Sequence, residues 1–339
     1  MEQINPRPHQ YMFRRSLLEN VKYPFVIVST LKAEERKDVI DFLLQLNAPV
    51  YSEAISGIRE EPSLQHLRIS NVENLWKLAE KAEYTIDGIL RIGGVPTLRA
   101  WRDLDDKQKD VAVWSISHLP FSGLSRGSLL PFELVYEPPP IIFNAETAKI
   151  WLKADRVHQE HLKMLVEEEP LAEPALLRQV SDLVAEQSLI YLGNSLPIRQ
   201  WDLMASYEPR SLNVFASRGM NGIDGQVSTF LGMAKPLQEN LGIFGDLTML
   251  YDLAAAWILP QMPNINVKIV VINNGGGKIF SKMFPQPEFQ NKHDHTFEHI
   301  AKQWGLEYHR GFRLKNISKN CLIELQPCPK ATERFWSKI

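Results

Sequence analysis

The chain has 339 residues, of which 44% are hydrophobic and 23% charged, and it carries a formal net charge of −2. A chain of this length suits two domains, each with enough apolar residues to bury a core. The nearly balanced charge gives no electrostatic reason to expect a nucleic acid or an anionic membrane surface as a partner.

Cysteine usage and the apolar runs favour a cytoplasmic protein. Cys321 and Cys328 are the two cysteines of the sequence, a number that suits a reducing compartment better than a disulfide framework. Residues 1–15 are polar, so we expect no signal peptide there. The longest apolar stretches, such as residues 267–272, have the length of a strand, so we expect no membrane-spanning helix.

The first half of the chain alternates strand-length apolar runs with segments of helical period. We expect strands at residues 24–30, 49–52, 85–92 and 111–116, and helices at residues 33–46 and 74–82. This alternation is typical of an α/β layer with a parallel sheet. Residues 137–140 (EPPP) can continue neither a helix nor a central strand, and we place the domain boundary near residue 158.

The second half repeats the α/β pattern. We expect helices at residues 176–187, 225–234, 248–259 and 299–303, and strands at residues 189–192, 214–217, 241–244, 268–272 and 321–325. The sequence therefore predicts two doubly wound parallel-sheet α/β domains. A linker-like segment would occupy residues 1–22, a first domain residues 23–158 and a second domain residues 159–339.

Polar and glycine residues follow two strands predicted to be neighbours in the second domain. Asp246 can supply a carboxylate oxygen, Asn274 a side-chain oxygen and Gly276 a backbone carbonyl, the hard ligands that magnesium prefers. Backbone N–H groups at Leu247 and Thr248 begin a helix and can meet phosphate oxygens. Open α/β sheets bind ligands at the carboxyl ends of their strands. Either motif alone could be an ordinary turn, but together they predict a magnesium diphosphate site.

This pair of motifs resembles the thiamin-diphosphate fingerprint Gly-Asp-Gly followed by Asn-Asn, with Leu247 in place of the third glycine. Four ordered segments narrow the resemblance: residues 192–199 (LGNSLPIR), 217–225 (SRGMNGIDG), 246–253 (DLTMLYDL) and 270–280 (VVINNGGGKIF). They resemble the 2-succinyl-5-enolpyruvyl-6-hydroxy-3-cyclohexene-1-carboxylate synthases of menaquinone biosynthesis. The likeness spans residues 189–310 and, more loosely, residues 23–140, which resemble that family's central domain.

The resemblance implies a thiamin-diphosphate enzyme that decarboxylates 2-oxoglutarate and adds the product to isochorismate. Because both substrates carry carboxylates, it implies substrate-binding roles for Arg199 and Arg218, and for Arg99, which stands where the family usually has a lysine. The remaining matches concern the bound cofactor. They place Asn194, Ser195, Gly245, Leu247 and Thr248 near the diphosphate, Ile223 under the bent cofactor, and Ile279 and Phe280 in the pocket wall.

The family's N-terminal pyrimidine-binding domain, which carries the glutamate that activates the cofactor, has no counterpart in the resemblance. We therefore expect half of a split synthase completed by a separate pyrimidine-domain chain, or part of a longer synthase. A catalytically inactive homologue acting as a binding or regulatory subunit is the alternative. Thiamin enzymes bind the cofactor between subunits, so we expect a homo-oligomer. For His293, His295 and His299 we favour a surface loop and helix over a metal cluster.

Overall fold

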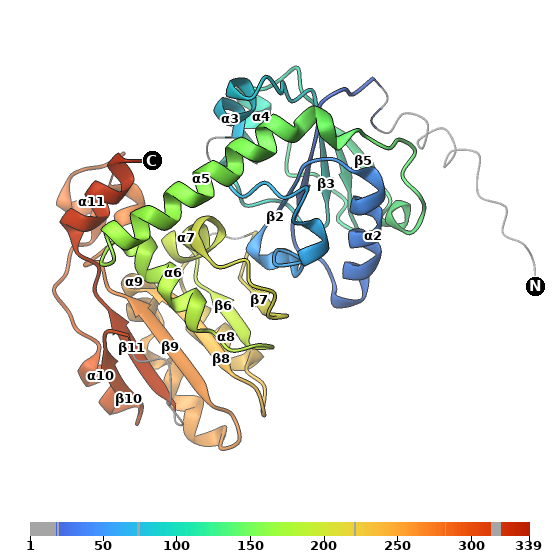
Figure 1. The fold of residues 1–339 in the computed structure, drawn as a ribbon. Coiled ribbons are helices and arrows are strands. Elements are labelled where there is room, and N and C mark those ends of the chain that lie inside the picture. The colour runs from blue at the N-terminus through green and yellow to red at the C-terminus, as the bar shows by residue number, and fades with distance from the viewer. Residues whose placement is uncertain (1–17, 19, 73–74, 220–221, 282, 313–319) are drawn as a thin grey trace, which may run out of the picture. The chain divides into compact units, whose positions relative to one another are not determined.

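The computed structural model describes residues 18, 20–72, 75–219, 222–281, 283–312 and 320–339 (Figure 1). The chain folds into two compact units, Met1–Glu160 and His161–Ile339, each with its own sheet. Most of the linker-like segment predicted at residues 1–22 lies outside the described residues.

Within its described residues, unit 1 contains a sheet of strand order β2-β1-β3-β4-β5 in which every neighbouring pair is parallel. Its strands are β1 (Pro24–Val28), β2 (Val50–Ser52), β3 (Gly88–Ile92), β4 (Ala112–Ile116) and β5 (Ser128–Leu130). Its helices are α2 (Arg36–Leu46), α3 (Leu75–Lys81), α4 (Arg99–Asp106) and the start of α5 (Lys149–Glu168), which continues past the unit boundary.

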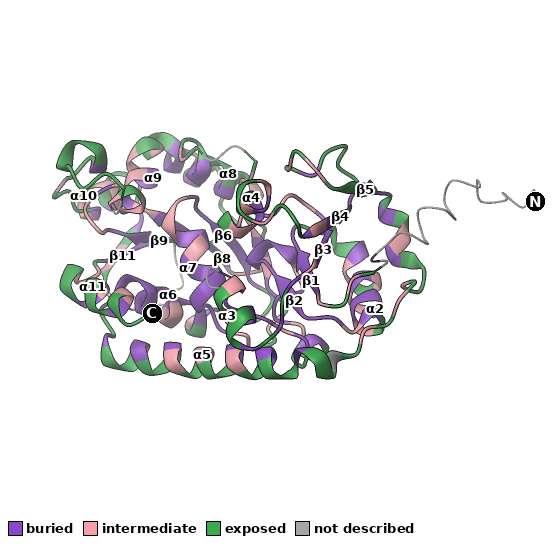
Figure 2. Ribbon diagram, turned by 90° about the horizontal axis from the view of Figure 1, so that it is seen from above, coloured by how far each residue is buried: buried purple, intermediate pink, exposed green. Residues whose placement is uncertain are grey.

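Helices cover both faces of this sheet, and the side chains of β1 alternate between them. Val26 and Val28 pack in one cluster with Phe42 of α2. Phe25 and Ile27 pack on the other face, in a cluster that includes Trp101 of α4. A strand buried on both faces is apolar at every position, and this explains why β1 is recognisable in the sequence as a continuous run. Figure 2 shows the buried strands between helices whose outer surfaces are exposed.

Unit 2, as far as it is described, contains a sheet of order β10-β11-β9-β8-β6-β7 in which every neighbouring pair is again parallel. Its strands are β6 (Leu189–Leu192), β7 (Asn213–Phe215), β8 (Asn240–Gly245), β9 (Val267–Ile272), β10 (Glu307–Arg310) and β11 (Cys321–Leu325). Its α-helices are α6 (Glu173–Leu183), α7 (Leu196–Met204), α8 (Gln226–Met233), α9 (Asp246–Tyr251), α10 (Glu298–Gln303) and α11 (Pro329–Ser337). The two parallel sheets confirm the predicted α/β fold class.

The strand order of unit 2 contains a topological switch between β6 and β8. From β6 the chain moves outward to β7, and it then returns across β6 to build β8 and β9 on the other side. The connections after β6 and β8 therefore leave in opposite directions. In an open parallel sheet, this divergence creates a crevice at the carboxyl ends of the two strands, where ligands bind.

The predicted elements differ from the observed ones mainly in the helices. The helix predicted at residues 248–259 is instead the short α9 followed by a 3₁₀ helix, Leu253–Gln261, which contains Pro260. Proline has no N–H to donate, so it disfavours a regular α-helix there. Helix α5 was not predicted and crosses the region around residue 158.

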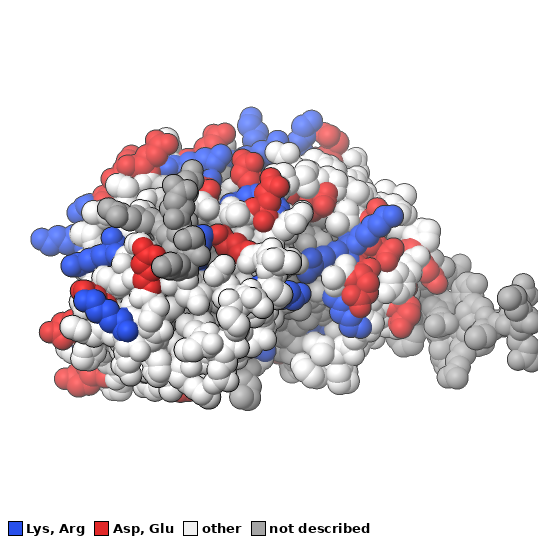
Figure 3. All heavy atoms as spheres, turned by 90° about the horizontal axis from the view of Figure 1, so that it is seen from below, with Lys and Arg blue, Asp and Glu red and all other residues white. Residues whose placement is uncertain are grey.

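No helix in the part of the chain that the structure describes is long and apolar enough to cross a bilayer. Lys and Arg side chains are interspersed with Asp and Glu on the face drawn in Figure 3, in line with the small net charge.

Candidate functional site

The carboxyl ends of β8 and β9 lie side by side. The two strands pair in parallel, with Gly245 opposite Ile272, so the residues that follow them leave the sheet at the same edge. Asp246 follows β8 directly, and Asn273 and Asn274 follow β9. The structure therefore brings the two predicted halves of the motif together.

The carboxylate of Asp246 joins these two chain segments. Its Oδ1 accepts a hydrogen bond from the backbone N–H of Leu247 at 2.6 Å. Its Oδ2 accepts from the N–H groups of Gly275 and Gly276 at 2.8 and 3.0 Å. The residue is 2% exposed. Three backbone donors hold the carboxylate at a fixed position, where it is ready to meet a cation without first being ordered.

Asn274 supplies a second oxygen at this edge. Its amide Nδ2 donates to Glu173 Oε2 at 2.9 Å, which directs the other end of the amide away from Glu173. Its Oδ1 is buried, and no donor among the described residues reaches it. Because a buried polar atom normally has a partner, an amide oxygen in this position is suited to a metal ion.

Glu173 is a buried carboxylate that the sequence analysis missed. It is 3% exposed, and besides Asn274 it accepts from Gln200 Nε2 at 3.0 Å. Burial, with a smaller contribution from the charge of Asp246, raises the pKa of Glu173 to about 7, even though the hydrogen bonds from Asn274 and Gln200 lower it. The negative charge of Asp246 therefore disfavours ionisation of the buried Glu173 carboxyl.

The backbone conformation after Asn274 requires glycine at positions 275 and 276. Gly275 has φ of +79° and Gly276 has φ of +134°, both in the left-handed half of the map. A Cβ on Gly276 would lie 2.4 Å from the backbone oxygen of Gln290, which is too close for any side chain. The predicted ligand, the carbonyl of Gly276, accepts from Lys278 N at 2.9 Å and keeps one lone pair for another partner.

His293 lies in a mostly exposed loop, as predicted, but its ring turns towards the carboxylate of Asp246. Its side chain is 8% exposed, and its Nε2 is 3.4 Å from Asp246 Oδ2. His295 and His299 are exposed, as predicted. Among the described residues, no three His, Cys, Asp or Glu side chains are grouped to hold a metal. A cation here would depend on Asp246 together with amide and carbonyl oxygens, as magnesium sites commonly do.

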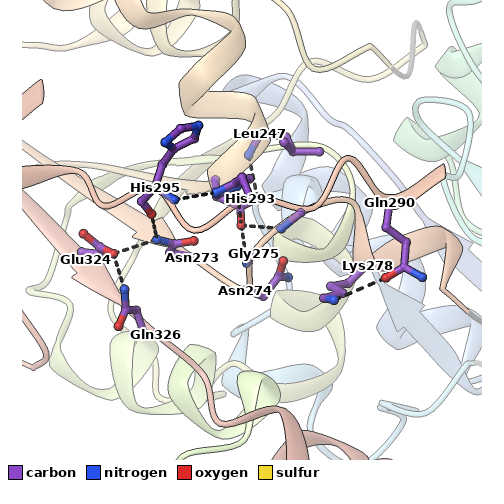
Figure 4. A network of polar contacts seen from close by, with 12 residues as sticks. Leu247, Asn273, Asn274, Gly275, Lys278, Gln290, His293, His295, Glu324 and Gln326 are labelled. Carbon is purple, nitrogen blue, oxygen red and sulfur yellow. Dashed lines mark hydrogen bonds and ion pairs between the residues drawn. The ribbon is translucent and has the colours of Figure 1, made fainter. Parts of the chain in front are cut away.

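The side-chain amide of Asn273 holds the loop around His295 in place (Figure 4). Its Nδ2 donates to Glu324 Oε1 at 2.7 Å and to the backbone oxygen of His295 at 2.8 Å. Glu324 is fully buried and also accepts from the N–H of Phe297 and from the hydroxyl of Tyr308. This network fastens residues 293–297 to the sheet, and it thereby holds His293 and Gly275 beside Asn274.

A second polar cluster lies at the end of β6. Because β6 pairs in parallel with β8, this end is at the same edge as Asp246. Asn194 donates from Nδ2 to the backbone oxygen of Gly222 at 2.7 Å and accepts at Oδ1 from Arg218 Nη1 at 2.6 Å. Ser195 has φ of +76°, which is rare for a residue with a side chain and is typical of functional turns. Its carbonyl accepts from Arg199 Nη1 at 2.5 Å.

The remaining predicted residues differ in burial and place. Thr248 is buried, Gly245, Leu247, Ile223 and Ile279 are half-buried, and Phe280 is 46% exposed. Arg99 belongs to unit 1, where it begins α4. Its side chain is 79% exposed and lies 3.7 Å from Asp103.

The groups at this edge of the sheet are suited to binding magnesium and a diphosphate. Asp246 offers a fixed carboxylate, Asn274 a buried oxygen with no donor, and Gly276 a carbonyl, all oxygen ligands of the kind that magnesium takes. Arg199 and Arg218 add positive charge near the end of β6. The arrangement can therefore hold a hard cation and anionic groups at one edge of the sheet.

No protein-family model matches the sequence. Among curated proteins, the chain is 40% identical over 332 residues to the 2-succinyl-5-enolpyruvyl-6-hydroxy-3-cyclohexene-1-carboxylate synthase of Bdellovibrio bacteriovorus, covering 94% of this chain and 62% of that protein. It is 37% identical over 316 residues to the synthase of the same name from Akkermansia muciniphila, covering 86% of this chain and 57% of that protein.

A synthase of that name from Bacillus pumilus is 24% identical over 317 residues. The chain thus spans about three fifths of the length of the first two relatives. These names give no support to the alternative of a non-catalytic regulatory subunit. By sequence, the chain is similar over 94% of its length to a 2-succinyl-5-enolpyruvyl-6-hydroxy-3-cyclohexene-1-carboxylate synthase.

Proposed function

We propose that unit 2 binds the diphosphate of thiamin diphosphate through a magnesium ion at the edge where β8 and β9 end. Asp246, the Oδ1 of Asn274 and the carbonyl of Gly276 would hold the ion. Leu247 and Thr248 would lie beside the phosphates, with the N–H of Thr248 facing them, because the N–H of Leu247 donates to Asp246. The observation that carries this proposal is the buried Oδ1 of Asn274, which has no donor among the described residues, while the N–H groups of the next two residues hold the carboxylate of Asp246.

The chemistry would be that of the family. When bound, thiamin diphosphate supplies the electron sink that allows a 2-oxo acid to lose carbon dioxide. The residues of this chain would bind and orient the reactants. Arg199 and Arg218 would pair with the carboxylates of 2-oxoglutarate and isochorismate, because guanidinium groups bind carboxylates through two parallel hydrogen bonds. Asn194 holds the head of Arg218 in place.

The apolar residues would shape the cofactor pocket. Ile223 would support the bent cofactor from below, and Ile279 and Phe280 would line the wall, while Ser195 would approach the diphosphate. Arg99 of unit 1 would add a further carboxylate-binding group. We place the protein in the cytoplasm as a homo-oligomer. The part of the relatives' length that this chain does not span would bring the pyrimidine-binding domain, on a separate chain or as a further segment.

Reconstitution tests this function. The chain is incubated with 2-oxoglutarate, isochorismate, thiamin diphosphate and Mg²⁺, alone and with a pyrimidine-binding domain taken from a full-length relative. We expect isochorismate-dependent release of carbon dioxide only in the mixture, and its loss when Asp246→Ala replaces the wild type. Full activity of the Asp246→Ala mixture, or no activity in any mixture, would contradict the proposal.

A further inference from the structure

Glu173 is brought to the magnesium site from a distant part of the sequence. It is the first residue of α6, 101 positions before Asn274, yet its Oε2 accepts from the amide of Asn274 at 2.9 Å. Its backbone N–H donates to Thr332 Oγ1 of α11 at 3.0 Å, and its Oε1 accepts from Gln200 of α7 at 3.0 Å. Three helices of unit 2 therefore fix where this carboxylate lies.

The chemical nature of Glu173 decides which way the amide of Asn274 faces. The two ends of an asparagine side chain have almost the same shape, so packing alone cannot distinguish oxygen from nitrogen. An ionised carboxylate can only accept hydrogen bonds, so it binds the Nδ2 end and leaves Oδ1 on the opposite side. This is the end that the structure leaves buried without a donor.

The neighbouring contacts are consistent with a carboxylate that acts as acceptor at both oxygens. Gln200 also presents its Nε2 to Glu173, while its own Oε1 is buried and has no partner among the described residues. An amide in place of Glu173 would allow both Gln200 and Asn274 to turn over, because either orientation would then find a partner. Glu173 thus determines which end of the Asn274 side chain, oxygen or nitrogen, faces away from it.

We propose that Glu173 is a positioning residue that holds Asn274 with its Oδ1 towards the magnesium ion, an inference that rests on the function proposed above. Residues that orient a metal ligand typically change metal affinity 10- to 100-fold when replaced, roughly the range to expect here. Glu173 does not itself bind the ion. Its effect passes through Asn274 and disappears when Asn274 is absent.

The test is a double-mutant cycle on the metal-binding step, with no catalysis involved. Mn²⁺, which electron paramagnetic resonance detects directly, serves as the probe in the full chain at pH 8. The variants are Glu173→Gln, Asn274→Ala and the two combined. We expect each single variant to lose roughly tenfold or more in Mn²⁺ affinity. We expect the double variant to lose no more than Asn274→Ala alone, because the two residues act through one contact.

Two further variants separate positioning from charge and from folding. Glu173→Asp keeps the charge but shortens the side chain by one methylene, which withdraws the acceptor from Asn274. We expect it to lose affinity as Glu173→Gln does, whereas a purely electrostatic role predicts that it binds like the wild type. The matched control is Glu169→Gln, which removes a buried glutamate whose side chain accepts from Arg334 at 2.5 and 2.6 Å, away from Asp246 and Asn274 in the hydrogen-bond network. We expect its Mn²⁺ affinity to be unchanged.

The measurements separate failure of the positioning role from failure of the magnesium site itself. Wild-type affinity in Glu173→Gln and Glu173→Asp, or additive losses in the cycle, overturn the positioning role while leaving the magnesium site intact. Should the wild-type chain itself fail to bind Mn²⁺, the proposed function fails and this inference with it. Should Glu173→Gln not fold, the Glu173→Asp variant alone decides: a roughly tenfold loss supports the inference, and wild-type binding refutes it.

Discussion

Replacing Glu173 by glutamine is expected to stabilise the metal-free protein, and to do so only at higher pH. Burial, assisted by Asp246 and opposed by Lys278, raises the pKa of this carboxyl from 4.5 to about 7 in the folded chain. In the unfolded chain the group ionises near its ordinary value. Between these two values the folded state holds a proton that the unfolded state has lost, so stability falls as the pH rises.

The magnitude follows from the size of this shift. Each unit of pKa difference corresponds to about 1.4 kcal/mol, so the penalty grows from zero below pH 4.5 to roughly 3 kcal/mol above pH 7. Glutamine has no charge to bury and avoids the penalty. The variant should therefore match the wild type near pH 4 and exceed it by about 3 kcal/mol at pH 8.

The assay is urea unfolding of wild type and Glu173→Gln in EDTA, repeated from pH 4 to pH 8 and followed by tryptophan fluorescence. The quantity compared is the difference in unfolding free energy at each pH. A constant difference across this range, or a variant that is less stable than the wild type at pH 8, would refute the reasoning. The expected gain in stability, combined with weaker metal binding, would mark Glu173 as a residue kept for function.

Three other changes probe the site. Asp246→Ala leaves three N–H groups without their acceptor, the partly buried ones of Leu247 and Gly275 and the buried one of Gly276, and should cost about 3 kcal/mol in urea unfolding; an unchanged midpoint would contradict this. Gly276→Ala should cost about 3 kcal/mol because its Cβ meets a backbone oxygen, whereas Gly305→Ala, with φ of +69° and open space, should cost about 1 kcal/mol. Equal costs would show that the close contact is unimportant. Arg218→Ala should raise the KM for 2-oxoglutarate roughly tenfold or more in the reconstituted enzyme, and an unchanged KM would remove it from substrate binding.

The fold class could be predicted because its strands are buried on both faces. Such strands appear as continuous apolar runs, and β6 and β11 were predicted with the same bounds that the structure shows. The helices were harder to predict from the sequence. Whether a segment becomes an α-helix or a 3₁₀ helix depends on a single residue such as Pro260 and on the packing around it. The edge strand β10, with an exposed and polar pattern, gives no such apolar signal.

The candidate site was predictable to the extent that its residues are close in sequence to strand ends. Asp246 and Asn274 follow adjacent parallel strands, and the rule that such ends share an edge brings them together. Glu173 and Gln200 were missed, and His293 was assigned to a surface loop without a place in the site, because all three reach the site only through tertiary packing. Glu173 begins a helix and resembles any acidic residue in a first turn, and His293 lies in a polar loop whose burial depends on the network around Glu324.

In the proposed function, one carboxylate and one amide oxygen at neighbouring strand ends hold a magnesium ion and, through it, a diphosphate. Isothermal titration calorimetry with Mg²⁺ and thiamin diphosphate tests this binding most directly, on the wild type, Asp246→Ala and Asn274→Ala. We expect saturable binding to the wild type and its loss or strong weakening in both variants. Absence of binding to the wild type, or wild-type affinity in both variants, would contradict the proposed function.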